Sequence, residues 1–364
     1  MNRAFVKILN CASQKLEAIA DKSVDLIVTS PPYPMIEMWD ECFIEQSPEV
    51  KEALIAGEWY RAYEAMHSVL NSIWTECDRV LKDNGFVCIN IGDATRTCGD
   101  TFRLFSNHSS IINFFESMGY CTLPDIHWRK QTNAPNKFMG SGMYPAGAYV
   151  TYEHEYILIF RKGGKRVFKG AEIVKRRESA YFWEERNVWF SDLWEIKGTQ
   201  QTIKLAKSRE RSAAYPAEIP YRLVNMYSAY GDTVLDPFGG TGTTAIVCTA
   251  LKRNCYIVDI DPEMCKKIRD NILLSKQFAS DLVDARIEQH QHYILSLPQE
   301  KLEKCYTNAP HGFLVKTRQE AELTLYKVKE IMEKGEMEFI IDYRLAECQS
   351  SMVTIKSPEV AMTE

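Results

Sequence analysis

The stretch from Asp232 to Asp261, DTVLDPFGGTGTTAIVCTALKRNCYIVDID, limits the possible folds more than any other part of the chain. It begins with a short apolar run, passes through a glycine-rich turn into a helical pattern, and ends in a second apolar run that stops at acidic residues. A strand, a crossover helix and a strand in this order build a parallel sheet whose two faces are covered by helices. The sequence therefore predicts an α/β protein.

Four more short apolar runs, rich in β-branched residues, are typical of strands buried on both faces of a parallel sheet. They lie near residues 5, 24, 86 and 155 and read FVKIL, VDLIVT, FVCINI and EYILIF. Between two of them, apolar residues from Glu58 to Leu81 recur at steps of three and four, which predicts a long amphipathic helix. Asp261 and Pro262 indicate the start of another helix.

The glycine-rich turn has the composition of a cofactor-binding loop. GTGTTA at 240–245 fits the GxGxxA pattern, and Asp259 follows about 20 residues later, where a carboxylate can accept from ribose hydroxyls. A nicotinamide cofactor and S-adenosylmethionine (SAM) both carry a ribose. Asp236, at the entrance of the loop, would repel a pyrophosphate but can pair with the α-amino group of SAM. SAM is therefore favoured over a dinucleotide, and over glycines that serve packing only.

A second candidate site follows the strand VDLIVT. Ser30, Pro31, Pro32 and Tyr33 come at the expected carboxyl edge of the sheet, where open α/β folds bind their ligands. The prolines remove two N–H donors and fix φ, so the carbonyls of this turn are left free and held rigidly. Ser30 adds a hydroxyl acceptor and Tyr33 an exposed ring. Such a set suits a flat ligand with an NH₂ group, although an isolated PPY would be only a tight turn with a packed tyrosine.

Taken together, DPFGGTGTT and VDLIVTSPPY resemble the SAM-dependent DNA amino-methyltransferases, which methylate exocyclic amines of bases. The similar segments extend over roughly residues 5–265 and include RVLKDNGFVCINIGD, IHWRKQTNAPN, EHEYILIFRKG and AAYPAEIPYRLV. Because the SPPY turn precedes the SAM loop, the chain resembles the β arrangement of that family. The resemblance implies a circularly permuted Rossmann-like fold with a mostly parallel seven-stranded sheet, in which FVKIL lies beside CYIVDI.

The resemblance also implies residue roles. Ser30, Pro31, Pro32 and Tyr33 would form the catalytic turn that holds the target amine. The implied cofactor-binding residues are Asp236, Phe238, Gly239, Gly240, Gly242, Thr243 and Asp259, together with Ser30. A serine before PPY resembles the cytosine-N4 enzymes, whereas Asp or Asn mostly accompanies adenine-N6 methylation. The expected activity is therefore methyl transfer from SAM to N4 of a cytosine rotated out of double-stranded DNA, within a restriction-modification system that includes a cognate endonuclease.

Three alternatives stay open at this point. The nearest is an adenine-N6 DNA methyltransferase on the same scaffold. The second is an enzyme that methylates RNA or a protein side-chain amide through a related PPY turn. The third is a DNA-binding protein of this fold without turnover. Ser30 and the permuted order argue against the second, and the intact Ser30, Tyr33, Asp236 and Asp259 argue against the third.

Outside the two motifs, the chain divides into three expected regions. Residues 1–276 form the catalytic domain, 163–212 a basic and aromatic insertion, and 277–364 a mainly helical extension that includes a helix in TRQEAELTLYKVKEIMEKGEM. Either the insertion or the extension could read the DNA target. The residues expected to contact DNA phosphates are Arg166, Lys169, Lys175, Arg176 and Arg177.

The chain departs from the family pattern at two places. Asn10-Cys11-Ala12 stands where many relatives have Gly-Asp-Cys, so a carboxylate expected near the SAM adenine is missing. Ser212-Ala213 stands where many have His-Pro before AYP. Both departures affect details of the SAM pocket rather than the class of activity.

Composition excludes several other classes of protein. The 364 residues carry a net charge of −5, which argues weakly against a surface that binds nucleic acid everywhere. The eleven cysteines include no CxxC pair, so reduced thiols are expected. His290 and His292 have no third ligand at a recognisable spacing, so a surface role is expected for them, and no metal site. There is no apolar run of about 18 residues, and a soluble, cytoplasmic protein is expected, with no membrane partner.

Overall fold

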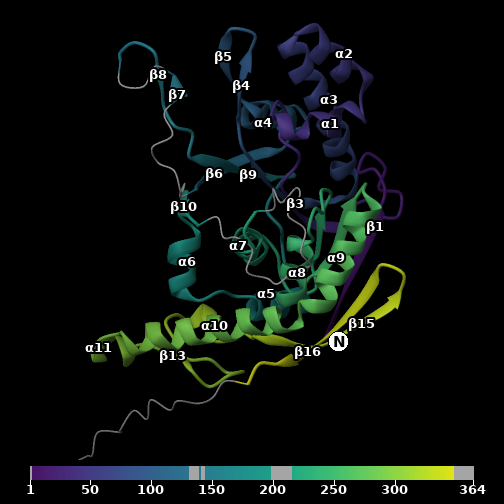
Figure 1. The fold of residues 1–364 in the computed structure, drawn as a ribbon. Coiled ribbons are helices and arrows are strands. Elements are labelled where there is room, and N and C mark those ends of the chain that lie inside the picture. Colours follow the sequence, from purple (N-terminus) through teal and green to yellow (C-terminus); the bar gives the residue numbers. More distant parts are fainter. Residues whose placement is uncertain (1, 131–138, 141–143, 198–214, 348–364) are drawn as a thin grey trace, which may run out of the picture.

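The computed structural model describes residues 2–130, 139–140, 144–197 and 215–347, and its centre is a ten-stranded sheet (Figure 1). The strand order is β10-β6-β9-β3-β2-β11-β12-β1-β16-β15. These strands are β1 Arg3–Asn10, β2 Val24–Thr29, β3 Leu81–Ile91, β6 Cys121–Arg129, β9 His154–Arg161, β10 Leu193–Glu195, β11 Thr233–Asp236, β12 Asn254–Asp259, β15 Tyr326–Gly335 and β16 Glu338–Leu345.

Among the described residues, three small ladders lie outside this sheet. They are β4 Ala94–Cys98 with β5 Thr101–Phe105, β7 Met139–Gly140 with β8 Ala148–Tyr149, and β13 Tyr306–Thr307 with β14 Leu314–Val315. The α-helices are α1 Asp40–Ile44, α2 Pro48–Ala56, α3 Trp59–Val80, α4 Asn107–Ser117, α5 Ala171–Glu178, α6 Trp183–Trp189, α7 Glu218–Tyr227, α8 Thr243–Ala250, α9 Pro262–Leu274, α10 Lys276–Leu295 and α11 Gln299–Leu302. Short 3₁₀ turns cover Glu37–Trp39 and Arg318–Glu320.

The pairing of β1 with β12 confirms the predicted permutation. The two strands are parallel, with Val6 opposite Cys255, so the first strand of the chain lies beside the last strand of the glycine-loop unit. The strands β3, β2, β11, β12 and β1 are all parallel, and the predicted α/β architecture is confirmed. The sheet has ten strands rather than the expected seven, because β10 extends one edge and the β15–β16 hairpin the other. β9 is antiparallel to both neighbours, although its buried sequence predicted a parallel strand.

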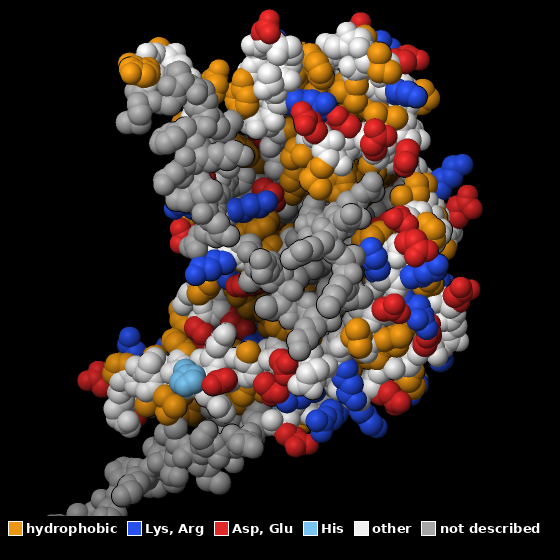
Figure 2. Space-filling model, in the orientation of Figure 1, with side chains coloured by type: hydrophobic (Ala, Val, Ile, Leu, Met, Phe, Trp, Pro, Cys, Tyr) orange, Lys and Arg blue, Asp and Glu red, His pale blue; other side chains and the backbone are white. Residues whose placement is uncertain are grey.

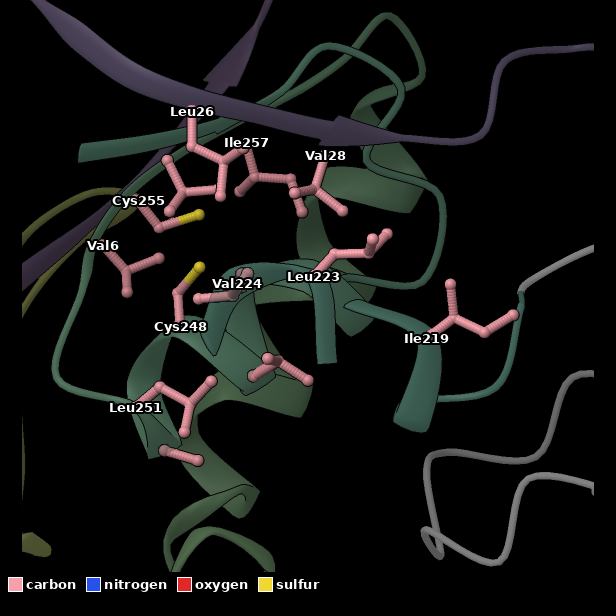
Figure 3. Close-up of a cluster of buried hydrophobic side chains, with 14 of the residues drawn as sticks. Val6, Leu26, Val28, Ile219, Leu223, Val224, Cys248, Leu251, Cys255 and Ile257 are labelled. Carbon is pink, nitrogen blue, oxygen red and sulfur yellow. The ribbon is translucent and has the colours of Figure 1, made fainter. Parts of the chain in front are cut away.

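Helices cover both faces of the central strands, which explains why all six residues of β2 are buried. Leu26 and Val28 point to the face covered by α7, α8 and α9, where they join the cluster drawn in Figure 3. Ile27 points to the opposite face and packs in a cluster with Trp74 of α3. This alternation fixes the register of β2, and therefore the position of the turn that follows it.

The described part of the region after residue 276, residues 277–347, is not the mainly helical extension that its composition suggested. The helix α10 is present, but the segment 317–337 contains β15 rather than a helix. β15 is an edge strand, where Glu and Lys side chains stay in water while the backbone pairs with β16. This pairing overrides the helix propensity of Glu and Lys. Because β16 also pairs with β1, the extension is part of the same sheet as the catalytic domain.

His290 is also placed differently from the prediction. It is 1% exposed, its ring stacks on Phe182 at 3.8 Å, and its two nitrogens contact Glu184 and the carbonyl of Leu314 at 2.7 and 2.8 Å. It therefore fastens α10 to the insertion, whereas its neighbour His292 is exposed as expected. Within the described ranges there is no group of three His, Cys, Asp or Glu able to hold a metal, and no helix long and apolar enough to cross a membrane.

Candidate active site

The carboxyl ends of β2 and β11 lie side by side and are joined by a buried hydrogen bond. The two strands pair in parallel, with Leu235 opposite Ile27. At their ends, Thr29 Oγ1 donates to Asp236 Oδ1 at 2.6 Å. The fold thereby brings the SPPY turn and the glycine loop to one edge of the sheet, although they are 207 residues apart in the sequence.

Asp236 organises the start of the glycine loop. It is 2% exposed, and besides Thr29 it accepts from Thr244 Oγ1 at 2.6 Å and from the backbone N–H of Phe238 at 3.1 Å. Burial raises the pKa of its carboxyl from 3.8 to about 7, an effect that the three hydrogen bonds partly oppose. The predicted contact of Asp236 with the amino group of a cofactor stays a prediction.

The glycine loop lies against β12 and α9, with no room for a side chain at Gly239 or at Gly242. A Cβ on Gly239 would stand 2.8 Å from Ile257 Cγ1, and one on Gly242 would stand 3.0 Å from Ile268 Cγ2. Gly242 also has φ of +86°, a conformation that L side chains rarely adopt, just before α8 begins at Thr243. The loop therefore presents bare backbone at the amino end of a helix, as a cradle for a ligand requires.

Asp259 fixes the loop from the neighbouring strand. Its Oδ2 accepts from the N–H of Gly240 at 2.9 Å, and its Oδ1 accepts from the N–H of Asp261 at the same distance. Burial raises the pKa of its carboxyl. The side chain is half-buried, so its predicted role toward a ribose stays a prediction that its position allows.

Tyr33 is held by hydrogen bonds rather than exposed as the sequence suggested. Its hydroxyl donates to Glu155 Oε2 at 2.9 Å, accepts from Asn90 Nδ2 at 2.8 Å, and lies 3.1 Å from Ser30 Oγ. Burial and the nearby Glu155 raise the pKa of Tyr33 well above its usual value, so the hydroxyl stays protonated. Lys130 forms an ion pair with the same Glu155.

The backbone around Tyr33 is fixed from two sides. A Cβ on Gly92 would stand 2.9 Å from Tyr33 Cε2, so only glycine lets the ring pack there. Asn107 is fully buried, and its Nδ2 donates to the carbonyls of Pro34 and Gly92, each at 3.0 Å. The PPY turn is therefore a rigid element clamped between β3 and α4.

Sequence reasoning missed Asn90, Glu155, Lys130 and Asn107. The first three lie in the segments FVCINIGD, EHEYILIF and IHWRKQTN, which resemble the family but carry no recognisable chemical spacing of their own. Asn90 and Glu155 come together because β3 and β9 are neighbours in the sheet. A signal for them could have been found in the polar residues at those strand ends, which interrupt otherwise apolar runs.

The five basic residues expected to contact DNA lie at the other edge of the sheet. Arg166 forms two hydrogen bonds with Asp232 at 2.6 and 3.0 Å and an ion pair with Asp25 at 3.5 Å, and both acids stand at the amino ends of strands. Lys175 lies near Gly231 on the same side. Arg166 is thus neutralised inside the protein, and the exposed Lys169, Lys175, Arg176 and Arg177 lie away from Tyr33. The rest of the insertion from 198 and the Ser212-Ala213 departure lie outside the described residues.

A ten-stranded Rossmann-like sheet with a glycine loop and a PPY turn at one edge defines an α/β methyltransferase, and comparison with known proteins narrows this class. The DNA methylase family model N6_N4_Mtase matches residues 24–270, so the chain belongs to this family of DNA methylases. It is 50% identical over 317 residues to the type II methyltransferase M.MthZI of Methanothermobacter thermautotrophicus, covering 86% of this chain and 88% of that protein.

Two other similarities point the same way. The chain is 49% identical over 281 residues to the type II methyltransferase M.MjaI of Methanocaldococcus jannaschii, covering 73% of this chain and 90% of that one. Among solved structures, the putative DNA modification methylase TTHA0409 of Thermus thermophilus, complexed with S-adenosyl-L-methionine, is similar with a TM-score of 0.57 and 27% identity. That match covers 74% of this chain and 95% of the other.

The residues at the carboxyl ends of β2, β11 and β12 fit S-adenosylmethionine, the methyl donor of such enzymes. The bare glycine backbone, the amino end of α8 and the half-buried Asp259 match the needs of a nucleoside with an amino-acid tail. SAM is therefore the cofactor that the family and this loop have in common. That Asp236 and the loop hold the methionine part of SAM, and Asp259 its ribose, stays a prediction.

Proposed function

We propose that this chain is a site-specific DNA methyltransferase that transfers a methyl group from SAM to the exocyclic N4 of cytosine in double-stranded DNA, as the modification enzyme of a restriction-modification pair. The single observation that carries the proposal is the junction of the SPPY turn with the glycine loop through Thr29 and Asp236. It brings a set of amine acceptors beside the candidate cofactor loop.

The choice of cytosine depends on Ser30. Family resemblance associates serine at this position with N4-cytosine methylation, whereas Asp or Asn would favour adenine N6. The alternative is therefore an adenine-N6 methyltransferase with the same geometry. Both bases present a planar NH₂ group to the hydroxyl of Ser30, so nucleoside identification is needed to distinguish them.

The amine of a paired base is hidden in the duplex, so the target nucleotide must rotate out of the stack into the pocket. The ring of Tyr33 then stacks on the flipped base. Ser30 Oγ and the carbonyl of Pro31 accept the two amine hydrogens and aim the nitrogen lone pair. Asn90 Oδ1 is buried and has no partner among the described residues, so it provides another acceptor beside Ser30.

When bound, SAM supplies the methyl group from its sulfonium, and the amine nitrogen forms the new N–C bond as the S–C bond breaks. The nitrogen must then release a proton. Ser30 Oγ, Tyr33 Oη and Glu155 form a continuous hydrogen-bonded path, with steps of 3.1 and 2.9 Å. Ser30 takes the proton, and the path delivers it to the Glu155 carboxylate, which Lys130 holds in place.

The DNA is expected along the carboxyl edge, where the β4–β5 and β7–β8 ladders project from the sheet (Figure 1). The β4–β5 hairpin begins at Ala94, just beyond the carboxyl end of β3. The β7–β8 ladder lies in the connection between β6 and β9, which meets the sheet at the same edge. Phe102 of β5 and Tyr149 of β8 stack at 4.7 Å and join the two ladders.

The test of the function is direct. The purified protein is incubated with SAM and unmethylated genomic DNA, the DNA is digested to nucleosides, and methylated nucleosides are identified by mass spectrometry. N4-methyldeoxycytidine supports the proposal. N6-methyldeoxyadenosine would establish the alternative, and transfer to RNA or protein but not to DNA would overturn both.

A further inference from the structure

A large groove lies at the amino-terminal edge of the sheet, opposite the candidate active site. Its volume is about 1200 Å³, and we call it the amino-edge groove. Its walls come from the start of β3, the end of β9, α5, α6, the end of α7 and the turn at Arg318–Glu320. The residues used below are Arg161, Lys165, Arg176, Arg186 and Arg318, with the aromatic rings of Phe168 and Trp183.

The groove is separate from the pocket at Tyr33. Asp25, at its base, is the second residue of β2, whereas the SPPY turn follows the last residue of that strand. A strand rises about 3.3 Å per residue, so the five steps from Asp25 to Ser30 place roughly 17 Å between the two sites. A base held at Tyr33 therefore does not reach the amino-edge groove.

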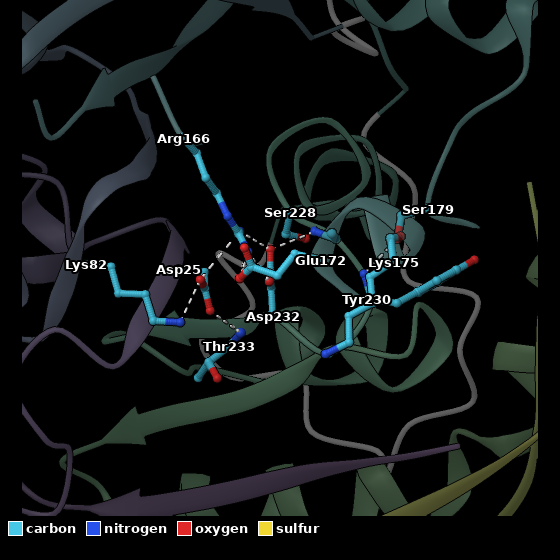
Figure 4. A network of polar contacts seen from close by, with 12 residues as sticks. Asp25, Lys82, Arg166, Glu172, Lys175, Ser179, Ser228, Tyr230, Asp232 and Thr233 are labelled. Carbon is cyan, nitrogen blue, oxygen red and sulfur yellow. Dashed lines mark hydrogen bonds and ion pairs between the residues drawn. The ribbon is translucent and has the colours of Figure 1, made fainter. Parts of the chain in front are cut away.

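The floor of the groove is an internal ion-pair network (Figure 4). Asp25 contacts Lys82 at 2.7 Å and Arg166 at 3.5 Å, and Arg166 pairs with Asp232. Asp25 also accepts from the backbone N–H of Thr233 at 2.9 Å. These charges neutralise one another and hold the ends of the strands together, so they are not available to a ligand.

The free charges of the groove are all positive. Its lining has eight Lys or Arg and four Asp or Glu, an excess of four positive charges on a chain whose net charge is −5. Each acid already has a partner. Asp25 belongs to the network described above, Asp83 pairs with Lys22, and Glu322 pairs with Arg177. The buried Glu320 accepts from the backbone N–H groups of Trp183 and Thr317. By contrast, five basic residues have no carboxylate within ion-pair distance in the described part of the chain; they are Arg161, Lys165, Arg176, Arg186 and Arg318.

The net charge of −5 shows that this excess is not a property of the whole chain. On the face drawn in Figure 2, basic and acidic side chains are intermixed. An uncompensated basic groove on an acidic protein indicates an anionic partner.

Aromatic side chains define what kind of anion fits. The ring of Phe168 contacts both Arg166 and Arg176, whose guanidinium carbons are 4.5 and 4.7 Å from its centre, and this contact holds Arg176 at the wall. Trp183 is 39% exposed, and its backbone is fixed by the hydrogen bond to Glu320 at 2.9 Å. An exposed indole among basic side chains, on a backbone held in place, offers a stacking platform for an unpaired base.

We propose that the amino-edge groove binds single-stranded nucleic acid, independently of the catalytic pocket. Phosphates lie against Lys165, Arg176 and Arg318, and a base stacks on Trp183. A duplex fits less well, because its bases are already stacked and cannot use the indole. DNA and RNA strands share this chemistry, and the experiment distinguishes them.

The experiment measures fluorescence anisotropy of labelled oligothymidylate, oligouridylate and a mixed-sequence duplex, each of roughly 12 nucleotides or base pairs, with the full chain. The double variant Lys165→Glu/Arg176→Glu is expected to bind single strands at least 10-fold more weakly. Its slope of log affinity against log salt should fall by about 0.7 for each phosphate that the protein no longer neutralises. Trp183→Ala should also weaken single-strand binding. Whichever oligomer binds more tightly identifies the preferred strand.

The controls separate the groove from the active site and from general charge effects. Lys51→Glu reverses one exposed charge on α2, the same change as each half of the double variant, and should leave single-strand affinity unchanged. Tyr33→Ala should also leave it unchanged. SAM affinity should be equal in all groove variants, which verifies that they are folded. The proposal would be overturned if Tyr33→Ala, but not the groove variants, weakened single-strand binding. It would also be overturned if the duplex bound more tightly than the single strands, or if polyglutamate competed as well as an oligonucleotide does.

Discussion

Thr29 Oγ1 lies 2.6 Å from Asp236 Oδ1, and this hydrogen bond joins the candidate catalytic turn to the candidate cofactor loop. Both residues are almost fully buried, and Asp236 has no basic partner among the contacts that fix it. The pKa of about 7 follows from this desolvation. The charge of Asp236 therefore changes in the physiological pH range, with consequences for cofactor binding.

The affinity for SAM is expected to rise as pH increases from about 6 to about 7.5, because Asp236 must be ionised to attract the positively charged cofactor. Isothermal titration calorimetry across this range measures the effect. In Asp236→Asn, binding should be weaker and nearly independent of pH. A wild-type affinity that is flat across this range would contradict the role given to this carboxylate.

The same group affects the stability of the ligand-free protein. In the unfolded chain Asp236 titrates near 3.8, and in the folded chain near 7, so folding favours its protonated form. Its stabilising contribution is therefore complete below about pH 3.8 and is lost as pH rises through about 7. Thermal melts at about pH 5 and 8 should show a larger loss of stability in the wild type than in Asp236→Asn. If the thermal stability of both proteins depended on pH in the same way, the raised pKa of Asp236 would be excluded.

Gly239→Ala is expected to reduce SAM affinity and to destabilise the fold by about 1–3 kcal/mol, the usual cost of overpacking, because the new Cβ meets Ile257 at 2.8 Å. Gly335→Ala is the matched control, since a Cβ there has no heavy atom within 4 Å. Urea unfolding and calorimetry measure the two quantities. Equal effects of the two substitutions would show that the loop is not tightly packed.

Tyr33→Ala should lower methyl transfer strongly while SAM affinity stays within about 2-fold. The lost stacking alone corresponds to about 1–3 kcal/mol, and the lost hydroxyl interrupts the path to Glu155. Tyr33→Phe keeps the ring and should be less impaired than Tyr33→Ala. Single-turnover assays with labelled SAM compare them, with the exposed Tyr306→Ala as control. An unimpaired Tyr33→Ala protein would remove the stacking role.

Glu155→Gln keeps the shape of the side chain but removes the proton acceptor at the end of the path from Ser30. Transfer should fall by about 100-fold, with an altered pH–rate profile and an unchanged affinity for SAM. Glu153→Gln, whose carboxylate pairs with Arg129 on the surface, is the control. If Glu155→Gln changed only DNA affinity and left the pH profile intact, the residue would serve positioning rather than proton transfer.

Patterns of neighbouring residues in the sequence predicted the helices, strands and turns that are determined by short-range interactions. The strand–glycine–helix unit, the helix from Trp59 to Val80, and the N-cap at Asp261, which accepts from the N–H of Glu263 at 2.8 Å, all follow from neighbouring residues. The position of β1 beside β12 was predictable because a permuted sheet leaves one vacant place for the first strand.

Features that depend on distant partners could not be predicted in this way. The interaction of Glu155 with Tyr33 requires the pairing of β9 with β3, which no local pattern specifies. Arg166 belongs to a basic run, yet Asp232, 66 residues away, binds it inside the protein. β15 has the composition of a helix, and only its pairing with β16 makes it a strand.

The most direct measurement is the identity of the methylated nucleoside produced by the wild type and by Ser30→Ala. DNA treated with each protein and SAM is digested and examined by mass spectrometry. We expect N4-methyldeoxycytidine from the wild type and at least about 100-fold less from Ser30→Ala, since the hydroxyl both orients the amine and takes its proton. N6-methyldeoxyadenosine from the wild type, or undiminished cytosine methylation by Ser30→Ala, would contradict the proposed function.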